Sequence, residues 1–154
     1  MKLTEIENSL PNGFHDALIE SILVDYPSKR ALIKLRLSVG DPDAATEKER
    51  EAYKEAELEL LNLVYFVIEA PDPTSKNAEV KELWIDGGEA KSSSAPATPV
   101  PMEHLPHGAS AYWFFVRDWN SFIHVAAMDA ALHWSPESES PKVSTSPPTH
   151  AAGR

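Results

Sequence analysis

The alternation of apolar and polar residues is clearest between residues 30 and 39. Ala31, Ile33, Leu35, Leu37 and Val39 share one parity, and the positions between them are mostly Arg, Lys or Ser. Side chains two residues apart point to the same face of a β-strand. This stretch is therefore predicted to be a strand with one buried face and one mostly charged face.

The segment before it, residues 17–26, has a broken alternation. Leu18, Ile22 and Val24 share a parity that Glu20 interrupts, and a β-bulge near Glu20 would restore the pattern on both sides. The sequence Tyr-Pro-Ser-Lys at residues 26–29 is typical of a turn, because proline suits the second turn position. An antiparallel hairpin over residues 17–39 follows.

Residues 40–69 contain a turn, a helix signal and an apolar run. The sequence Gly-Asp-Pro-Asp at 40–43 ends the second strand, and Thr46 with Glu49 three residues later has the form of a capping box. A short helix over residues 47–54 is predicted. A helix could continue through residues 55–69, but the β-branched and aromatic residues at 64–68 favour a buried strand, and we predict a strand there.

The second half of the chain supplies the remaining strands. A short strand at 80–86 is expected to stop at Gly87-Gly88, another covers 111–116, and residues 117–120 reverse the chain. Residues 122–134 then form one or two strands, with a break near Met128-Asp129. The predicted fold is mainly β, an antiparallel sheet of six or seven strands with one short helix, curled into a sandwich or partly open barrel.

Three stretches are poor candidates for packed structure. Residues 87–108 are rich in Gly, Ser, Ala and Pro, and residues 70–78 have turn chemistry throughout, so both are expected to be loops, the first of them flexible. Residues 135–154 contain four prolines and one large aliphatic residue, which predicts a disordered tail. The chain is thus expected to be one antiparallel β domain, residues 1–134, followed by that tail.

Composition narrows the compartment and the partners. The chain lacks cysteine and has no apolar run approaching the roughly 20 residues of a membrane span. Its first residues are interrupted by acids where a secretory signal would be apolar. We therefore expect a soluble, cytoplasmic protein. The formal net charge is −10, and no cluster of Lys and Arg is present, which excludes nucleic acid as a ligand.

The negative charge is concentrated in one stretch. Residues 41–69 hold nine acidic against three basic residues, whereas residues 1–40 hold five of each. Such a stretch is most often a solvated face, but it can also steer a basic protein partner. The candidate partner-binding residues are Asp41, Asp43, Glu47, Glu51 and Glu55.

The sequence NGFHDA places His15 and Asp16 side by side where the first strand begins. Consecutive side chains of a flat strand point to opposite faces, so a catalytic His-Asp pair would need a bulge there or a different Asp. The structural interpretation is favoured: Asp16 accepts hydrogen bonds from turn amides, and His15 packs half-buried with one hydrogen bond.

A second polar cluster begins at Arg117-Asp118 and continues to His124. An Arg-Asp pair in a reversal is commonly a surface ion pair, and His124 shares its parity with Phe122 and Ala126, which is typical of a core histidine. The weak catalytic candidates are thus His15, Asp16, Asp118 and His124. A metal site that used His15 and His124 is the alternative, although no metal or other cofactor is expected.

Three motifs also carry a resemblance: LPNGFHDA at 10–17, GDPD at 40–43 and RDWNSFIH at 117–124. Together they resemble a group of small bacterial proteins of unknown function. More loosely, they are similar to some immunity proteins encoded beside polymorphic toxins, which also begin with an FHDA-like segment and continue as antiparallel sheets. The looser resemblance implies a toxin-neutralising role and assigns no chemistry to any residue.

Two functions therefore remain open. The first is a non-enzymatic protein-binding module, of immunity type, that engages a basic partner. The second is a small metal-binding or ligand-binding barrel, with or without enzymatic activity, in which His15 and His124 lie near the site. Hydrolase and nucleotide-binding motifs are missing from the sequence, which favours the first.

Overall fold

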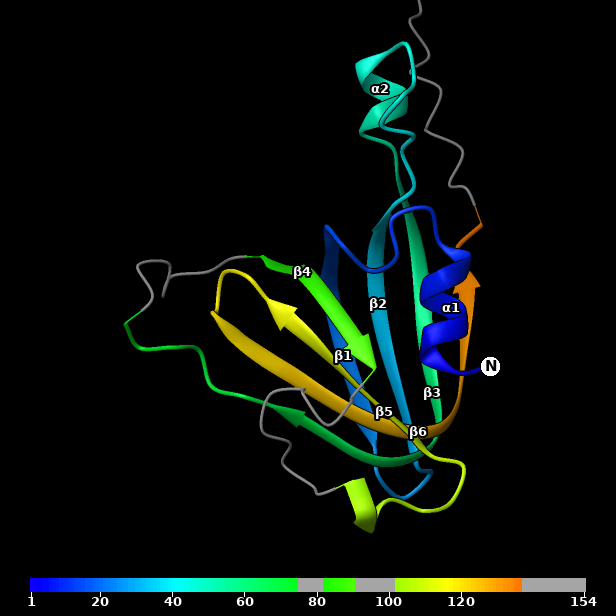
Figure 1. The fold of residues 1–154 in the computed structure, drawn as a ribbon, viewed down its shortest axis with the longest axis vertical. Helices are drawn as coiled ribbons and strands as arrows, with labels where there is room; N and C mark the ends of the chain where they lie inside the picture. The colour runs from blue at the N-terminus through cyan, green and yellow to red at the C-terminus, as the bar shows by residue number, and fades with distance from the viewer. Residues whose placement is uncertain (75–81, 91–101, 137–154) are drawn as a thin grey trace, which may run out of the picture.

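The structure is a computed structural model that describes residues 1–74, 82–90 and 102–136. In the described residues, six antiparallel strands close into a barrel in the order β1-β2-β3-β6-β5-β4 (Figure 1). The elements in chain order are α1 (Leu3–Ser9), β1 (Ala17–Asp25), β2 (Arg30–Ser38), α2 (Glu47–Arg50), β3 (Tyr53–Ile68), β4 (Leu83–Ala90), the 3-10 helix η1 (Met102–His104), β5 (Ser110–Val116) and β6 (Ser121–Trp134).

The first hairpin matches its sequence pattern. The alternating apolar residues of β2 are buried, and the register between β1 and β2 shifts between Ile19 and Ser21, at the position predicted for the bulge. The extra residue lets Ile19 before the bulge and Ile22 and Val24 after it pack against the same core. The helix-or-strand question at residues 55–69 is settled as well, because β3 runs unbroken from Tyr53 to Ile68.

The strands β3 and β6 form the longest ladder of the barrel. Their pairing runs from Ala56 opposite Trp134 to Ile68 opposite Ile123, with a register shift between Leu63 and Tyr65. On one side of this ladder β2 pairs with the first part of β3, and on the other β5 pairs with the first part of β6. The bulge bends the ladder so that it belongs to both halves of the barrel.

The predicted break in β6 near Met128-Asp129 is wrong, because the strand is continuous. Its partner changes there instead. β5 pairs with β6 only as far as Ala127, and beyond that point the first residues of the chain take its place: the Ala130 amide donates to the Met1 carbonyl at 2.7 Å, and Lys2 Nζ donates to the Met128 carbonyl. Polar residues are tolerated at this position because the chain start lies against them.

Helix α1 is an element that the sequence prediction missed. Its apolar residues Leu3 and Ile6 are buried with Leu10 in the same core cluster as the strands, and their spacing of three and four residues is the helical signal that could have revealed it. In Figure 1, α1 lies against the barrel beside β6. It therefore supplies part of the barrel core.

The interior is filled by side chains. Tyr112 and Phe114 of β5 point inward and meet Phe14 edge to face, with ring centroids 6.0 and 5.4 Å from its ring. Burial, and then the nearby Glu7 carboxylate, raise the pKa of the Tyr112 hydroxyl far above its usual range. The hydroxyl is therefore protonated at neutral pH.

The expected stop at Gly87-Gly88 is also wrong, since β4 continues through both glycines to Ala90. The first four residues of the loop predicted at 87–108 are thus strand, residues 102–104 form η1, and residues 91–101 lie outside the described residues. A Cβ at position 88 would lie 2.7 Å from Cε1 of Tyr112. Gly88 is required for close approach of the ring, and it does not mark a turn.

We expect Gly88→Ala to destabilise the fold by about 1–3 kcal/mol, because the added methyl group overlaps Tyr112 and the Trp113 carbonyl. The matched control is Gly87→Ala, whose Cβ would have no atom within 4 Å and which should change stability by less than about 1 kcal/mol. Urea unfolding followed by circular dichroism measures both. Equal losses in the two variants would contradict the packing argument.

Candidate functional site

The turn before β1 is fixed from two sides. The Gly13 amide donates to the Leu10 carbonyl, and the Asn12 side chain donates to the Ser38 hydroxyl at 3.1 Å and to the Gly40 carbonyl at 3.3 Å. Phe14 is buried in the core. Because its neighbours are anchored, His15 is held at the surface at one end of the barrel.

Asp16 has a φ of 56°, in the left-handed region. This backbone conformation interrupts the extended chain, so that the side chains of His15 and Asp16 lie on the same side, with His15 Nδ1 3.0 Å from Asp16 Oδ2. The structure thus brings the two together in spite of the opposition expected in a flat strand. The His15 side chain is 56% exposed, slightly more than the expected half-burial.

Two more charged side chains complete a group that we call the His15 cluster: His15, Asp16, Asp86 and Arg117. Asp86 Oδ1 lies 3.7 Å from His15 Nε2, and Arg117 Nη1 lies 3.8 Å from an oxygen of each carboxylate. Backbone pairing explains this convergence, because β4 lies between the start of β1 and the end of β5. The Asp16 amide donates to the Ile85 carbonyl, and the Arg117 amide donates to the Trp84 carbonyl.

The cluster borders a surface cavity of about 220 Å³. The residues around this cavity come from the turn before β1 and from the segment that follows β2: Asn12, His15, Asp16, Ser38, Gly40, Pro42 and Arg50. Asp86, which the sequence analysis did not single out, was hidden because it precedes the two glycines taken as a strand end. Arg117 contacts carboxylates from two other elements.

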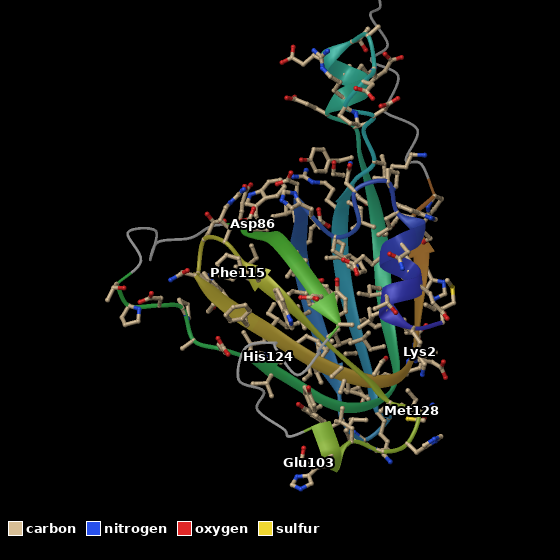
Figure 2. The ribbon with its side chains drawn as sticks, in the orientation of Figure 1. Lys2, Asp86, Glu103, Phe115, His124 and Met128 are labelled. Carbon is tan, nitrogen blue, oxygen red and sulfur yellow. The ribbon has the colours of Figure 1, made fainter. Side chains whose placement is uncertain are left out.

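His124 lies elsewhere, near the start of β6. It is fully buried, its Nε2 is 2.6 Å from Glu69 Oε1, and Nδ1 has no hydrogen-bond partner among the described residues. Its ring packs beside Phe122, and Trp113 faces it across the β5–β6 ladder. Figure 2 labels His124 and Asp86 at well-separated places on the barrel, so His15 and His124 do not share a site.

Asp118 lies in the predicted reversal between β5 and β6. The Asn120 amide donates to the Arg117 carbonyl, and the Asn120 side chain donates to Asp72 Oδ2 at 2.9 Å. Hydrogen bonds from Thr74, followed by that of Asn120, lower the pKa of Asp72.

Among the residues that the structure describes, three or more possible metal ligands come together only at His15, Asp16 and Asp86. Asp118 and His124 are outside this group.

The segment between β2 and β3 projects from the end of the barrel at which His15 lies (Figure 1). We call residues 39–52 the acidic arm. Its base is closed by a bond from the Val39 amide to the Ala52 carbonyl, and α2 is capped by Thr46, which accepts from the Glu49 amide. A Cβ at Gly40 would lie 1.8 Å from the Arg50 carbonyl oxygen, so only glycine fits there.

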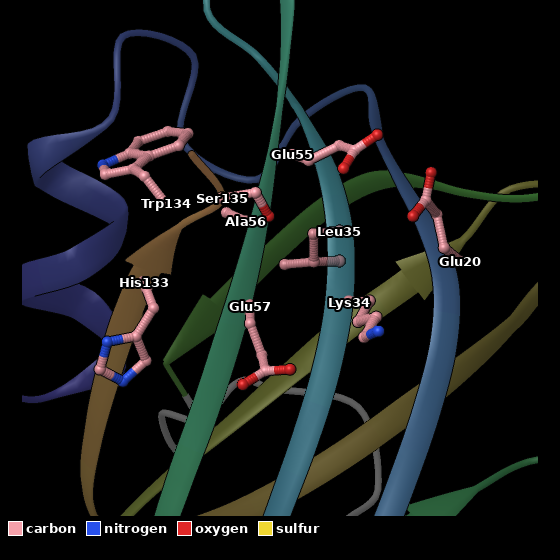
Figure 3. Close-up of a pocket in the computed structure, with 9 residues that line it drawn as sticks. All are labelled: Glu20, Lys34, Leu35, Glu55, Ala56, Glu57, His133, Trp134 and Ser135. Carbon is pink, nitrogen blue, oxygen red and sulfur yellow. The ribbon is translucent and has the colours of Figure 1, made fainter. Parts of the chain in front are cut away.

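A larger cavity, of about 330 Å³, lies on the outer face of four adjacent strands (Figure 3). Charged side chains predominate around it, including Glu20 of β1, Lys34 of β2 and Glu55 of β3. Lys34 faces Glu57 across the β2–β3 ladder, so part of the negative charge is balanced within the face itself. The sequence analysis did not foresee this cavity.

Glu59 of β3 has a side chain that is only 15% exposed. Arg30 pairs with it, and His133 Nε2 lies 3.1 Å from its second oxygen. Burial acts to raise the pKa of Glu59, but the hydrogen bonds from His133 and Arg30 outweigh this and lower it below the usual value near 4.5. A carboxylate with a lowered pKa stabilises the fold at neutral pH, and this contribution is lost as the pH falls through its pKa.

We therefore expect Glu59→Gln to lower the free energy of unfolding by about 1 kcal/mol at neutral pH. The difference from the unsubstituted protein should begin to shrink as the pH falls below about 4.5, where the carboxyl of the unfolded chain takes up a proton. It should be lost once the pH falls through the lower pKa of Glu59 in the folded protein. The control is Glu57→Gln on the same strand. Urea titrations at several pH values measure this, and a difference that stays constant into acid would contradict the assignment.

The comparisons with known proteins leave the family open. No family model matches the chain, and no curated protein matches it. A solved structure of an uncharacterized protein from Neisseria gonorrhoeae is similar, with 12% sequence identity and a TM-score of 0.45, over 77% of this chain and 91% of that one. In the part of the chain that is described, no helix is long and apolar enough to cross a membrane.

Proposed function

We propose that this chain is a non-enzymatic, cytoplasmic protein-binding module whose acidic arm engages a basic protein partner. The observation that carries the proposal is the projection of the arm from the end of the barrel (Figure 1). Asp41, Asp43, Glu47 and Glu51 lie on it and are exposed, and Glu55 is exposed where the arm returns to the barrel in β3.

The charge of the arm supports a basic partner. Residues 41–51 contain five acidic and two basic residues, a net charge of −3. One of the two bases, Arg50, is bonded within the arm, where its Nη1 donates to the Ala44 carbonyl at 3.2 Å. A projecting surface of one sign raises the rate of encounter with a partner of the opposite sign.

The arm is also organised before binding. The Asp41 amide donates to the Glu49 carbonyl, the Asp43 amide donates to Asp41 Oδ1, and the Asn12 side chain holds the Gly40 carbonyl. A loop that is already ordered loses less conformational entropy when a partner binds. The arm therefore has the two properties, charge and order, that a recognition element needs.

The immunity-type role extends this proposal on the resemblance of the three sequence motifs. The partner would then be a basic toxin domain, neutralised by occupation of its surface, and no catalytic group would be needed. The alternative barrel site that uses His15 and His124 together has no support in the geometry, since the two histidines contact different carboxylates.

The test is affinity capture on the immobilised full chain from a lysate of the native host, with identification by mass spectrometry. We expect a basic protein whose capture falls as salt rises from about 0.05 to about 0.3 M. Capture should fall roughly tenfold for the double variant Glu47→Gln/Glu51→Gln, because two exposed charges of the arm are removed. Neither side chain takes part in the capping of α2 by Thr46 and Glu49.

The matched control is Glu20→Gln/Glu57→Gln, which removes the same charge from the outer face of the barrel. It should capture the partner as the unsubstituted chain does. Equal loss in the two double variants would mean that overall charge, rather than the arm, governs binding. Capture that is insensitive to salt would count against a basic partner.

A further inference from the structure

The protein-binding proposal leaves the His15 cluster unexplained. Three residues that can bind metal ions, His15, Asp16 and Asp86, each offer one ligand atom, and these atoms lie within 4.8 Å of one another. They come from two separate elements, the turn before β1 and strand β4, which the closure of the barrel brings together. The group borders the cavity of about 220 Å³.

The arrangement already holds a cation between its carboxylates. Arg117 Nη1 is 3.8 Å from Asp16 Oδ1 and 3.8 Å from Asp86 Oδ1. The two carboxylates carry two negative charges against this single guanidinium, so the cluster retains a negative charge while His15 is neutral. The Arg117 side chain is 47% exposed, and it can therefore leave this position without uncovering a buried group.

The donor set selects the kind of ion. One imidazole nitrogen with two carboxylate oxygens suits a divalent transition ion such as zinc, whereas Mg²⁺ and Ca²⁺ prefer oxygen ligands alone. Ligand atoms around tetrahedral zinc lie about 3.3 Å apart, given bond lengths near 2.0 Å. The 3.0 Å contact of Asp16 is to His15 Nδ1, and the 3.7 Å contact of Asp86 is to His15 Nε2. A single ion would use one of these nitrogens, and the three ligand atoms, within 4.8 Å of one another, would close around it.

We propose that His15, Asp16 and Asp86 bind a divalent ion of the zinc class, and that Arg117 occupies the cation position when the ion is absent. The two cations then compete for the same pair of carboxylates. Removal of the arginine should therefore strengthen metal binding, although it removes two ion pairs from the cluster. A purely structural ion-pair network predicts no saturable metal binding in any variant.

Isothermal titration calorimetry of the full, untagged chain with ZnCl₂ tests the proposal. We expect one saturable site, weakened at least tenfold in His15→Gln and in Asp86→Asn. It should be strengthened in Arg117→Met. Titration with MgCl₂ should give no saturable binding, because the imidazole nitrogen contributes little to that ion.

The matched control is His133→Gln. His133 is equally exposed, at 57%, but it contacts a single carboxylate, that of Glu59, so zinc binding should be unchanged in this variant. Circular dichroism melts establish that each variant folds. If Asp86→Asn melts at a lower temperature than the unsubstituted chain, the His15→Gln variant alone tests the site, because the His15 side chain is 56% exposed and its replacement should not disturb the core.

Zinc should also raise the melting temperature of the unsubstituted chain, and the shift should be absent in His15→Gln, because an ion that binds only the folded state stabilises it. Binding that persists in His15→Gln, binding that weakens in Arg117→Met, or no saturable binding below about 1 mM zinc would each overturn the proposal. None of these outcomes bears on the acidic arm, whose variants leave the cluster intact.

Discussion

The fold depends on the bent ladder between β3 and β6. The two strands pair over nearly their whole length, and the bulge between Leu63 and Tyr65 lets one ladder serve two differently directed parts of the sheet. This bend encloses the core, in which the inward side chains of β2 and of β5 belong to one cluster. The N-terminal helix then covers the stretch of β6 that β5 is too short to reach.

The sequence predicted a strand correctly wherever the pattern depends only on residues close together in the chain. The alternation in β2, the bulge near Glu20 and the aromatic run of β3 each determine backbone conformation over a few residues, and the structure agrees with all three. Prediction failed where a residue's conformation depends on contacts with an element far away in the sequence. Gly88 was predicted to end a strand, but it lies within β4 because the Tyr112 ring packs against it. Met128-Asp129 was predicted to break a strand, but β6 continues there because the chain start bonds to that edge.

The candidate site was less predictable than the fold for the same reason. The sequence drew attention to His15 and Asp16, and to the Arg117 reversal, but it could not show that they meet. Their meeting depends on the register with which β4 joins β1 and β5, which is a property of the closed barrel. Asp86 carries no local signal at all. His124, which looked comparable to His15, is buried and contacts Glu69 in a different part of the barrel.

The acidic arm is attached in a way that leaves its exposed side chains out of the core. Backbone hydrogen bonds, the single Asn12 side chain and the tight approach at Gly40 hold the arm, whereas the exposed side chains of α2 contribute nothing to the core. Residues at these positions are therefore open to substitution without loss of stability. Such an attachment separates the stability of the barrel from the side-chain chemistry of the arm, so that the arm can change its surface on an unchanged scaffold.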